Sequence, residues 1–447
     1  ALAHADLPFE AIVERVNPIR SQAYAPLAQV WLSFDQSAIT ELASQSVDIG
    51  VAGGLRVSAA EPSEISSKVD LTVGIADSSS GWQGSIVYAT DLYDPGTVAV
   101  FAERFVRALD GLTGDPARPV GDATILSTPE AAALQRWTSG GSVRPGAATV
   151  ADALGAAHLA HAEQIAVVDA GNRAEGSSPG GSTQWTYAGF GALVNALARR
   201  LIDLGVGPDV AVAVGIPRSP EMLVAVHAVI VAGGHYVPVD PEAPASVVAH
   251  LLDTAQVAAA LTVSEASGVF ADAADRLPVT IVDLTELERA DGRPVTDRDR
   301  LAPLRPDHAA YTLFTSGSTG QPKGVTVSHG ALTALLTWFT PAGIEPRDER
   351  VLVKTPFTFD ASVWELFWPL IVGAHAVVAG VDDHREPTAV ARSLAEYDIT
   401  MVQFVPSMLS VFLDEVSDAA AALSTVRRIY TGGEALTPAL TQHTLAT

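Results

Sequence analysis

From residue 149 to residue 447, continuous apolar runs alternate with amphipathic stretches. Strand-like apolar runs lie at 210–215, 257–262 and 279–283, and helix-like stretches lie at 190–204 and 219–232. Strands that are apolar throughout and alternate with helices are typical of parallel sheets covered on both faces. Residues 149–447 are therefore predicted to form an α/β domain, interrupted by a Gly- and Ser-rich loop at 172–184.

The first part of the chain, residues 1–112, has a different pattern. A short helix is predicted at 11–16, strands at 28–34, 70–75 and 84–89, and an amphipathic helix after a cap at Asp94. Residues 113–148 are punctuated by Gly, Pro and Ser and contain one short helical stretch at 129–137. The pattern predicts an α+β unit, a linker and the larger α/β domain, in that order.

Composition narrows the class of protein. Of 447 residues, 48% are hydrophobic and 17% are charged, which excludes a disordered chain. Lys and Arg number 27 against 51 Asp and Glu, a net charge of 27 − 51 = −24, so nucleic-acid or anionic-membrane partners are not expected. The absence of cysteine excludes disulfides, thiolate metal sites and a Cys nucleophile, and agrees with a cytoplasmic enzyme.

One apolar stretch, Met222–Gly234, is a candidate membrane segment. It is shorter than the roughly 20 residues that a spanning helix needs, and His227 interrupts it. We therefore expect a buried helix at this position.

The loop Thr315-Ser-Gly-Ser-Thr-Gly-Gln-Pro-Lys-Gly324 carries the strongest chemical signal. Its glycines let backbone N–H groups turn inward, its hydroxyls add donors, and Lys323 adds a positive charge, as polyphosphate binding requires. The spacing differs from a Walker A loop. A solvated turn between two strands is the alternative.

This loop resembles the signature of the adenylate-forming superfamily, which includes acyl-CoA synthetases, luciferases and the adenylation domains of nonribosomal peptide synthetases. The segment Phe359–Phe367 resembles the amino-acid pocket motif of the peptide-synthetase branch. Further segments that resemble family motifs, in the family's order, are Trp185–Tyr187, Ala232–Asp240 and Tyr430–Leu436. Segments that resemble the end of a condensation domain are His4–Glu10, Arg20–Ser21 and Pro26–Val30.

The resemblance implies a domain plan and a reaction. It implies the C-terminal lobe of a condensation domain in residues 1–112 and, in residues 149–447, the N-terminal core of an adenylation domain, with parallel-rich sheets flanked by helices. The reaction implied is ATP-dependent formation of aminoacyl-AMP with release of pyrophosphate. Residues expected to bind the ATP phosphates are Thr315, Ser316, Gly317, Ser318, Thr319, Gly320 and Lys323, and those expected along the adenine are Gly433, Glu434 and Ala435.

The same resemblance implies an amino-acid pocket made of Asp360, Ala361, Trp364, Gln403, Tyr430 and Gly432. Asp360 would hold the substrate's α-ammonium, since a carboxylate among Phe357, Phe359, Val363 and Trp364 is costly to bury unpaired. Asp360 as the N-cap of a helix over 361–367, Gln403 as a satisfied core amide and Trp364 as a core residue are the alternatives. Small Ala361 and Gly432 beside polar Gln403 and Tyr430 favour glutamine or glutamate.

Several parts that the family uses are not found, so we expect a piece of a larger protein. No Tyr-Gly-Pro-Thr-Glu segment is present, and the catalytic Lys and the Mg²⁺ ligand are expected downstream. The 11 histidines show no metal-binding spacing, so no metal site is predicted. Implied partners are the adjacent condensation and C-terminal adenylation subdomains and a carrier domain with a phosphopantetheine thiol. An acyl-CoA synthetase-like ligase and a noncatalytic scaffold are the other two functions considered.

Overall fold

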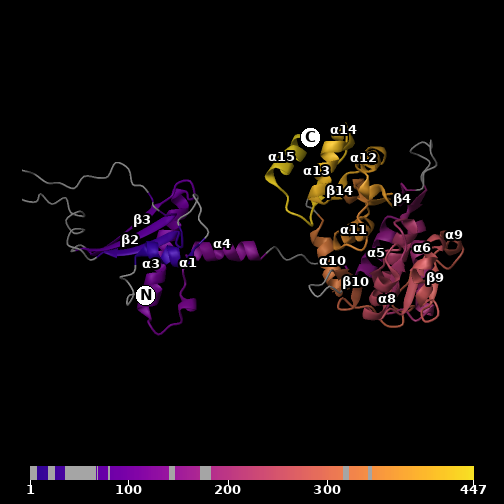
Figure 1. Ribbon diagram of the computed structural model, residues 1–447. Helices are drawn as coiled ribbons and strands as arrows, with labels where there is room; N and C mark the ends of the chain where they lie inside the picture. Colours follow the sequence, from indigo (N-terminus) through magenta and orange to yellow (C-terminus); the bar gives the residue numbers. More distant parts are fainter. Residues whose placement is uncertain are drawn as a thin grey trace, which may run out of the picture. The chain divides into compact units, whose positions relative to one another are not determined.

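In the computed structural model, the described residues form two compact units, Ala1–Gly141 and Ser142–Thr447 (Figure 1). The structure describes residues 8–18, 26–35, 67, 69–78, 81–139, 146–171, 183–315, 322–340 and 345–447.

The smaller unit is built on a mixed three-stranded sheet. Strands β1 (Val30–Asp35) and β2 (Leu71–Ser78) run parallel, and β2 pairs with β3 (Gly81–Tyr88) in antiparallel register. The described helical segments of this unit are α1 (Phe9–Val16), α3 (Pro95–Gly114), the 3₁₀ turn η2 (Val120–Asp122) and α4 (Thr128–Thr138). The cap predicted at Asp94 is confirmed, because its carboxylate accepts the Thr97 N–H at 2.8 Å. The unit is α+β, as the sequence predicts.

The larger unit contains two six-stranded sheets. In sheet 1 the order is β11 (Lys323–Ser328), β10 (Ala309–Thr315), β7 (His235–Pro238), β6 (Ala211–Gly215), β8 (Ala259–Thr262) and β9 (Val279–Ile281). In sheet 2 the order is β15 (Arg428–Thr431), β14 (Met401–Phe404), β12 (Arg350–Val353), β13 (His375–Val378), β4 (Ile165–Asp169) and β5 (Gln184–Thr186). The described pairs are parallel except at one edge of each sheet, β10–β11 and β4–β5.

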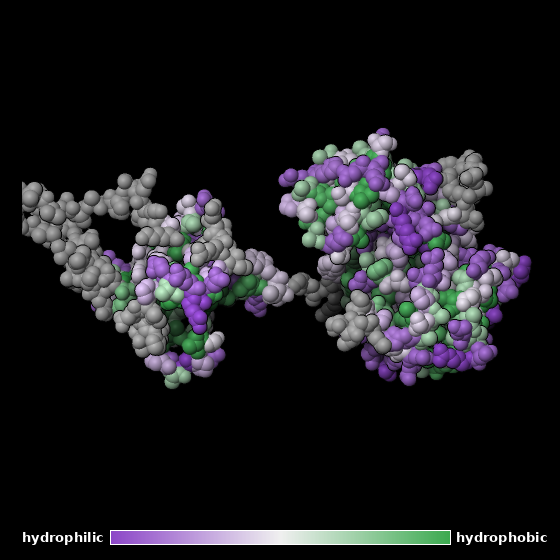
Figure 2. All heavy atoms as spheres, viewed as in Figure 1, coloured by the Kyte–Doolittle hydropathy of each residue, from purple (hydrophilic) through white to green (hydrophobic). Residues whose placement is uncertain are grey.

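Helices cover both faces of both sheets, which makes five layers (Figure 1). The helices between the sheets are α5 (Val150–Ala160), α6 (Tyr187–Asp203), α7 (Pro220–Ala232), α10 (His329–Trp338) and α11 (Val363–Val372). Sheet 2 is covered outside by α12 (Pro387–Glu396), α13 (Pro406–Glu415) and α14 (Ala419–Ala422), and sheet 1 by α8 (Ala245–Thr254) and η4 (Ser264–Ala273). The remaining helical segments are α9 (Leu284–Leu287), η5 (Pro346–Asp348), η6 (Asp360–Ser362), η7 (Asp383–Arg385) and α15 (Pro438–Ala446). On the face seen in Figure 2, hydrophilic and hydrophobic residues are interspersed over the surface of this unit.

Alternate residues of the central strands point to opposite layers, as strand geometry requires. In β12, Val351 and Val353 pack into the central layer, whereas Leu352 packs outward against α12 and α13. In β14, Met401 packs inward and Phe404 packs outward. The continuous apolar runs in the sequence follow directly from burial on both faces.

The buried helix predicted at Met222–Gly234 is confirmed as α7, whose residues from Met222 to Ala232 are all buried. His227 of this helix stacks on Phe367 of α11, with ring centroids 5.0 Å apart, and its Nε2–H donates to the Leu366 carbonyl at 2.9 Å. Among the described residues, no helix is both long and apolar enough to span a bilayer.

The structure confirms the predicted strands and helices of the larger unit to within a few residues. One boundary was wrong: Gln184, assigned to the loop at 172–184, begins strand β5 and pairs with Val168. This edge strand is short and Gln184 is an exposed polar residue, so the pattern of hydrophobic residues in the sequence does not reveal where the strand begins. Residues 172–182 of that predicted loop lie outside the described residues.

Burial in the central layer generates a prediction about acid stability. Burial lowers the pKa of His158 and His329 to about 4 and that of His227 to about 3. In an unfolded chain the pKa of a histidine is about 6.5. Between these values the unfolded chain binds protons that the folded chain does not. The free energy of unfolding therefore falls as pH decreases from 6.5, by up to about 1.4 kcal/mol per pH unit for each histidine.

Urea unfolding followed between pH 5 and pH 7 measures this slope. His158→Leu removes one of the three groups and should make the slope shallower. Equal slopes for this variant and the unsubstituted protein would contradict the lowered pKa of His158 in the folded chain.

Candidate functional site

Three of the predicted pocket residues meet where β14, β15 and α11 come together. Gln403 and Tyr430 are register partners in the parallel pair β14–β15, so their side chains lie next to each other on the face toward the central layer. Trp364 of α11 donates its Nε1–H to the Oε1 of Gln403. The Gln403 amide is thus hydrogen-bonded, as its burial requires, and Trp364 is both a core residue and part of this cluster.

Phe339 joins this cluster, and the sequence did not indicate it. The ring of Phe339, directly after α10, lies 4.8 Å from that of Trp364 and 4.6 Å from that of Tyr430, between ring centroids. The centroids of Trp364 and Tyr430 are 5.0 Å apart. The three rings therefore pack together as one group, which we call the aromatic triad.

Asp360 and Ala361 lie in η6, directly before α11, the helix that carries Trp364. Asp360 is exposed, so the expectation of a buried carboxylate was wrong. The 3₁₀ turn directs the chain outward before α11 begins, and Phe359 is also 62% exposed. Burial raises the pKa of Tyr311 in β10, and the negative charge of Asp360 raises it further.

Asp360 is not the cap of a helix over 361–367, which corrects the alternative drawn from the sequence. Helix α11 begins at Val363 after Ser362, without a side-chain cap. The Ser362 hydroxyl instead donates to the Phe359 carbonyl at 2.6 Å. The Asp360 carboxylate therefore has no capping role in α11.

Glu365 is a second residue that the sequence analysis missed. It is fully buried, and its carboxylate accepts the backbone N–H groups of Lys354 and Thr355 at 3.0 and 2.8 Å and the Thr355 hydroxyl at 2.6 Å. Burial raises the pKa of Glu365, and buried Lys354 nearby opposes that shift. A charged residue inside the otherwise apolar stretch 363–372 is the sequence signal that could have revealed this contact.

These bonds close the loop between β12 and α11. The N–H groups of Lys354 and Thr355 follow the last residue of β12, and Glu365 lies in the first turns of α11. The loop between β12 and α11 is therefore joined to α11 at two points. Its first residues are bound by the Glu365 carboxylate, and its last residues continue directly into the helix.

The residues predicted along the adenine lie in a turn after β15. Gly433 has φ +87°, a conformation that favours glycine, and a Cβ added to Gly432 would meet no atom within 4 Å. Glu434 is exposed and accepts the N–H and hydroxyl of Ser407, both at 3.0 Å, at the start of α13. Ala435 is also exposed. The space beside Gly432 is thus open.

The predicted phosphate loop connects β10 to β11. Thr315, the last residue of β10, is the register partner of Lys323, the first residue of β11, and both are exposed. These two residues therefore form the base of a hairpin. Ser316, Gly317, Ser318, Thr319 and Gly320 lie outside the described residues.

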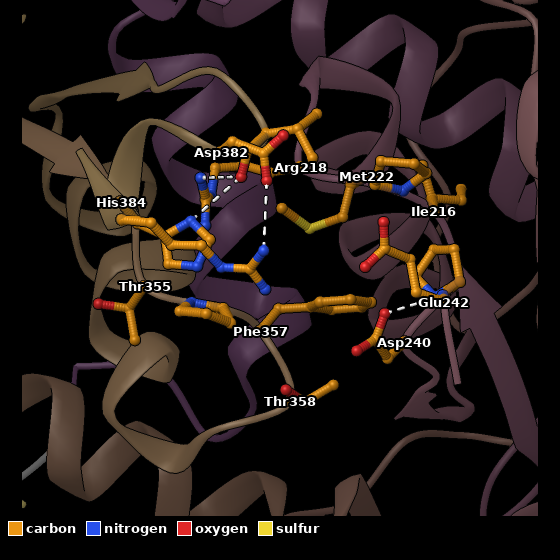
Figure 3. Close-up of a pocket in the computed structure, with 15 residues that line it drawn as sticks. Ile216, Arg218, Met222, Asp240, Glu242, Thr355, Phe357, Thr358, Asp382 and His384 are labelled. Atoms are coloured by element: carbon orange, nitrogen blue, oxygen red, sulfur yellow. Dashed lines mark hydrogen bonds and ion pairs between the residues drawn. The ribbon is translucent and has the colours of Figure 1, made fainter. Parts of the chain in front are cut away.

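A pocket of about 150 Å³ lies where loops from both sheets meet (Figure 3). Its lining includes Arg218 after β6, Asp240 and Glu242 after β7, and Phe357 after β12. Arg218 donates to the carbonyls of Gly380 and Val381, at 2.7 and 3.0 Å, and so joins a loop of sheet 1 to a loop of sheet 2. The carboxyl ends of parallel strands in the two sheets therefore converge on one region.

Comparisons with known proteins match both units. A family model described as "AMP-binding enzyme" matches residues 156–447, and one described as "Condensation domain" matches residues 1–135. Phosphinothricin tripeptide synthetase PhsB of Streptomyces viridochromogenes is 36% identical over 98% of the chain, which spans 36% of that protein. A dimodular nonribosomal peptide synthase of Bacillus subtilis is 33% identical over 96% of the chain, which spans 18% of that protein.

Solved structures agree with these matches. The crystal structure of the nonribosomal peptide synthetase FmoA3 is 26% identical and superposes with a TM-score of 0.69, covering 85% of this chain and 39% of that one. The chain spans only about a third of the length of the first curated relative and less of the second.

The contacts of Glu365 generate a stability prediction. Glu365→Ala leaves one buried and one partly buried N–H group without an acceptor and Lys354 without its carboxylate, so we expect a loss of about 3 kcal/mol or more in the free energy of unfolding. Glu365→Gln keeps an acceptor oxygen and should lose less. Urea denaturation measures both variants, and an unchanged midpoint for Glu365→Ala would contradict the role assigned to this carboxylate.

Proposed function

Because this chain belongs to the AMP-binding enzymes, as the adenylation domain of a nonribosomal peptide synthetase preceded by condensation-domain sequence, we propose that it activates an amino acid as its adenylate. The convergence of Trp364, Gln403 and Tyr430 beside Asp360 carries the proposal. These residues lie at the carboxyl ends of β12, β14 and β15, where open α/β sheets bind their ligands.

The proposed reaction joins the amino acid to AMP. A carboxylate oxygen of the amino acid attacks the α-phosphorus of ATP, the bond from that phosphorus to the bridging oxygen breaks, and pyrophosphate leaves. This chain contributes by positioning the two reactants and by stabilising phosphate charge. Asp360 would pair with the α-ammonium, and Lys323 at the base of the β10–β11 hairpin would face the leaving phosphates, together with Thr315, Ser316, Gly317, Ser318, Thr319 and Gly320.

Glutamine or glutamate is the substrate that these side chains favour. A tryptophan N–H can only donate, so the Gln403 oxygen faces Trp364 and the Gln403 NH₂ remains as a donor. A substrate side chain that ends in a carbonyl or carboxylate oxygen would accept from it. Tyr430 offers a hydroxyl, and the space beside Gly432 and Ala361 would admit a side chain of medium length.

The nucleotide would extend from the substrate toward the turn at Gly433, Glu434 and Ala435, with the adenine along that turn. Among the described residues, no group of three or more Asp, Glu, His or Cys side chains is placed to hold a metal ion. The acyl group would then pass to the phosphopantetheine thiol of a carrier domain, with a thioester formed and AMP released. A reaction that consumes ATP fits the cytoplasmic location expected from the sequence.

Amino-acid-dependent ATP–pyrophosphate exchange tests the proposed reaction. The full-length synthetase is assayed with each of the twenty amino acids, and we expect the highest exchange rate with glutamine or glutamate. Absence of exchange with every amino acid would contradict activation and favour a scaffold. Exchange with leucine or phenylalanine alone would contradict only the substrate assignment.

Substitution of Asp360 tests the ammonium contact. A charge-assisted hydrogen bond contributes about 1.5–3 kcal/mol, so Asp360→Ala should raise the KM for the amino acid by about tenfold or more and leave the KM for ATP unchanged. Asp360→Asn keeps the shape and removes the charge, and should behave similarly. An equal loss of affinity for both substrates would contradict a specific role in amino-acid binding.

A further inference from the structure

Phe339 contacts both aromatic residues of the proposed pocket, Trp364 and Tyr430. It stacks on Trp364 at an interplanar angle of 26° and lies against Tyr430 at 34°. Its ring also packs edge-on against Trp368, with 6.2 Å between centroids. Phe339 is partly exposed, whereas Trp364 is only 6% exposed, so Phe339 covers the face of Trp364 that it contacts.

Two other residues of the proposed pocket, Gly432 and Ala361, are small. A Cβ at Gly432 would have no neighbour within 4 Å, and Ala361 carries only a methyl group. Trp364 itself is held by its hydrogen bond to Gln403, which in turn lies beside Tyr430 in the sheet. Phe339 follows α10 and belongs to no strand, and no hydrogen bond of its side chain fixes the position of its ring.

We propose that Phe339 is a specificity-determining residue of the amino-acid site, and that its ring sets the depth of the pocket. The Phe339 ring covers both Trp364 and Tyr430, whose own ring centroids lie 5.0 Å apart, so a substrate ring cannot lie against these two residues and the site is restricted to side chains of medium length. Removal of the Phe339 ring opens a space bordered by three aromatic side chains, which suits an aromatic substrate. This inference rests on the proposed function.

Exchange profiles of the full-length synthetase test the inference. The quantity to measure is a ratio: the kcat/KM for phenylalanine divided by the kcat/KM for the amino acid that the unsubstituted enzyme uses best. We expect this ratio to rise about tenfold or more in Phe339→Ala, because a difference of one methylene in a hydrophobic pocket already changes such ratios by about tenfold. Trp338→Ala is the matched control, because Trp338 is the preceding residue and is 68% exposed. It should leave the ratio unchanged.

The outcomes separate the two hypotheses. No exchange by the unsubstituted enzyme with any amino acid overturns the proposed function, and the inference with it. An active enzyme whose Phe339→Ala variant keeps its KM for ATP and its amino-acid profile overturns only the role of Phe339. If Phe339→Ala does not fold, Phe339→Leu decides: a shift toward phenylalanine supports the proposal, and an unchanged ratio overturns it.

Discussion

Helix α7 constrains the whole larger unit, because it is apolar on every side. An amphipathic helix can rest on one sheet, but a helix with no polar face must be covered all round. Sheet 1 lies on one side of the central layer and sheet 2 on the other, and the neighbouring helices fill the rest. The one polar side chain in the apolar part of α7, His227, is accommodated as a neutral ring that stacks on Phe367 and donates to Leu366.

The position of the candidate site follows from this layering. Since both sheets share the central helices, the loops that follow their parallel strands come together, and Arg218 ties two of these loops. Within sheet 2, the connection after β12 leads to β13 on one side and that after β14 leads to β15 on the other. Such a change of direction leaves a crevice at the carboxyl ends of the strands, and Asp360, Gln403 and Tyr430 lie at that edge.

Much of this architecture could be predicted from the sequence, because strands buried on both faces and an all-apolar helix leave strong patterns. The predicted pocket residues Trp364, Gln403 and Tyr430 do meet. Phe339 and Glu365 were missed, since their roles depend on contacts with residues distant in the chain. Asp360 was expected to be buried or to cap a helix. Neither holds, because a 3₁₀ turn precedes α11, and local preference does not distinguish this turn from a helix start.

A crystal structure of the synthetase with a non-hydrolysable glutamyl- or glutaminyl-adenylate analogue tests the central claim most directly. We expect the α-ammonium within about 3 Å of the Asp360 carboxylate, and the substrate side chain against Trp364 and Tyr430 with its oxygen facing the Gln403 NH₂. An amino-acid moiety bound away from these residues, for example in the pocket beside Arg218, would contradict the account.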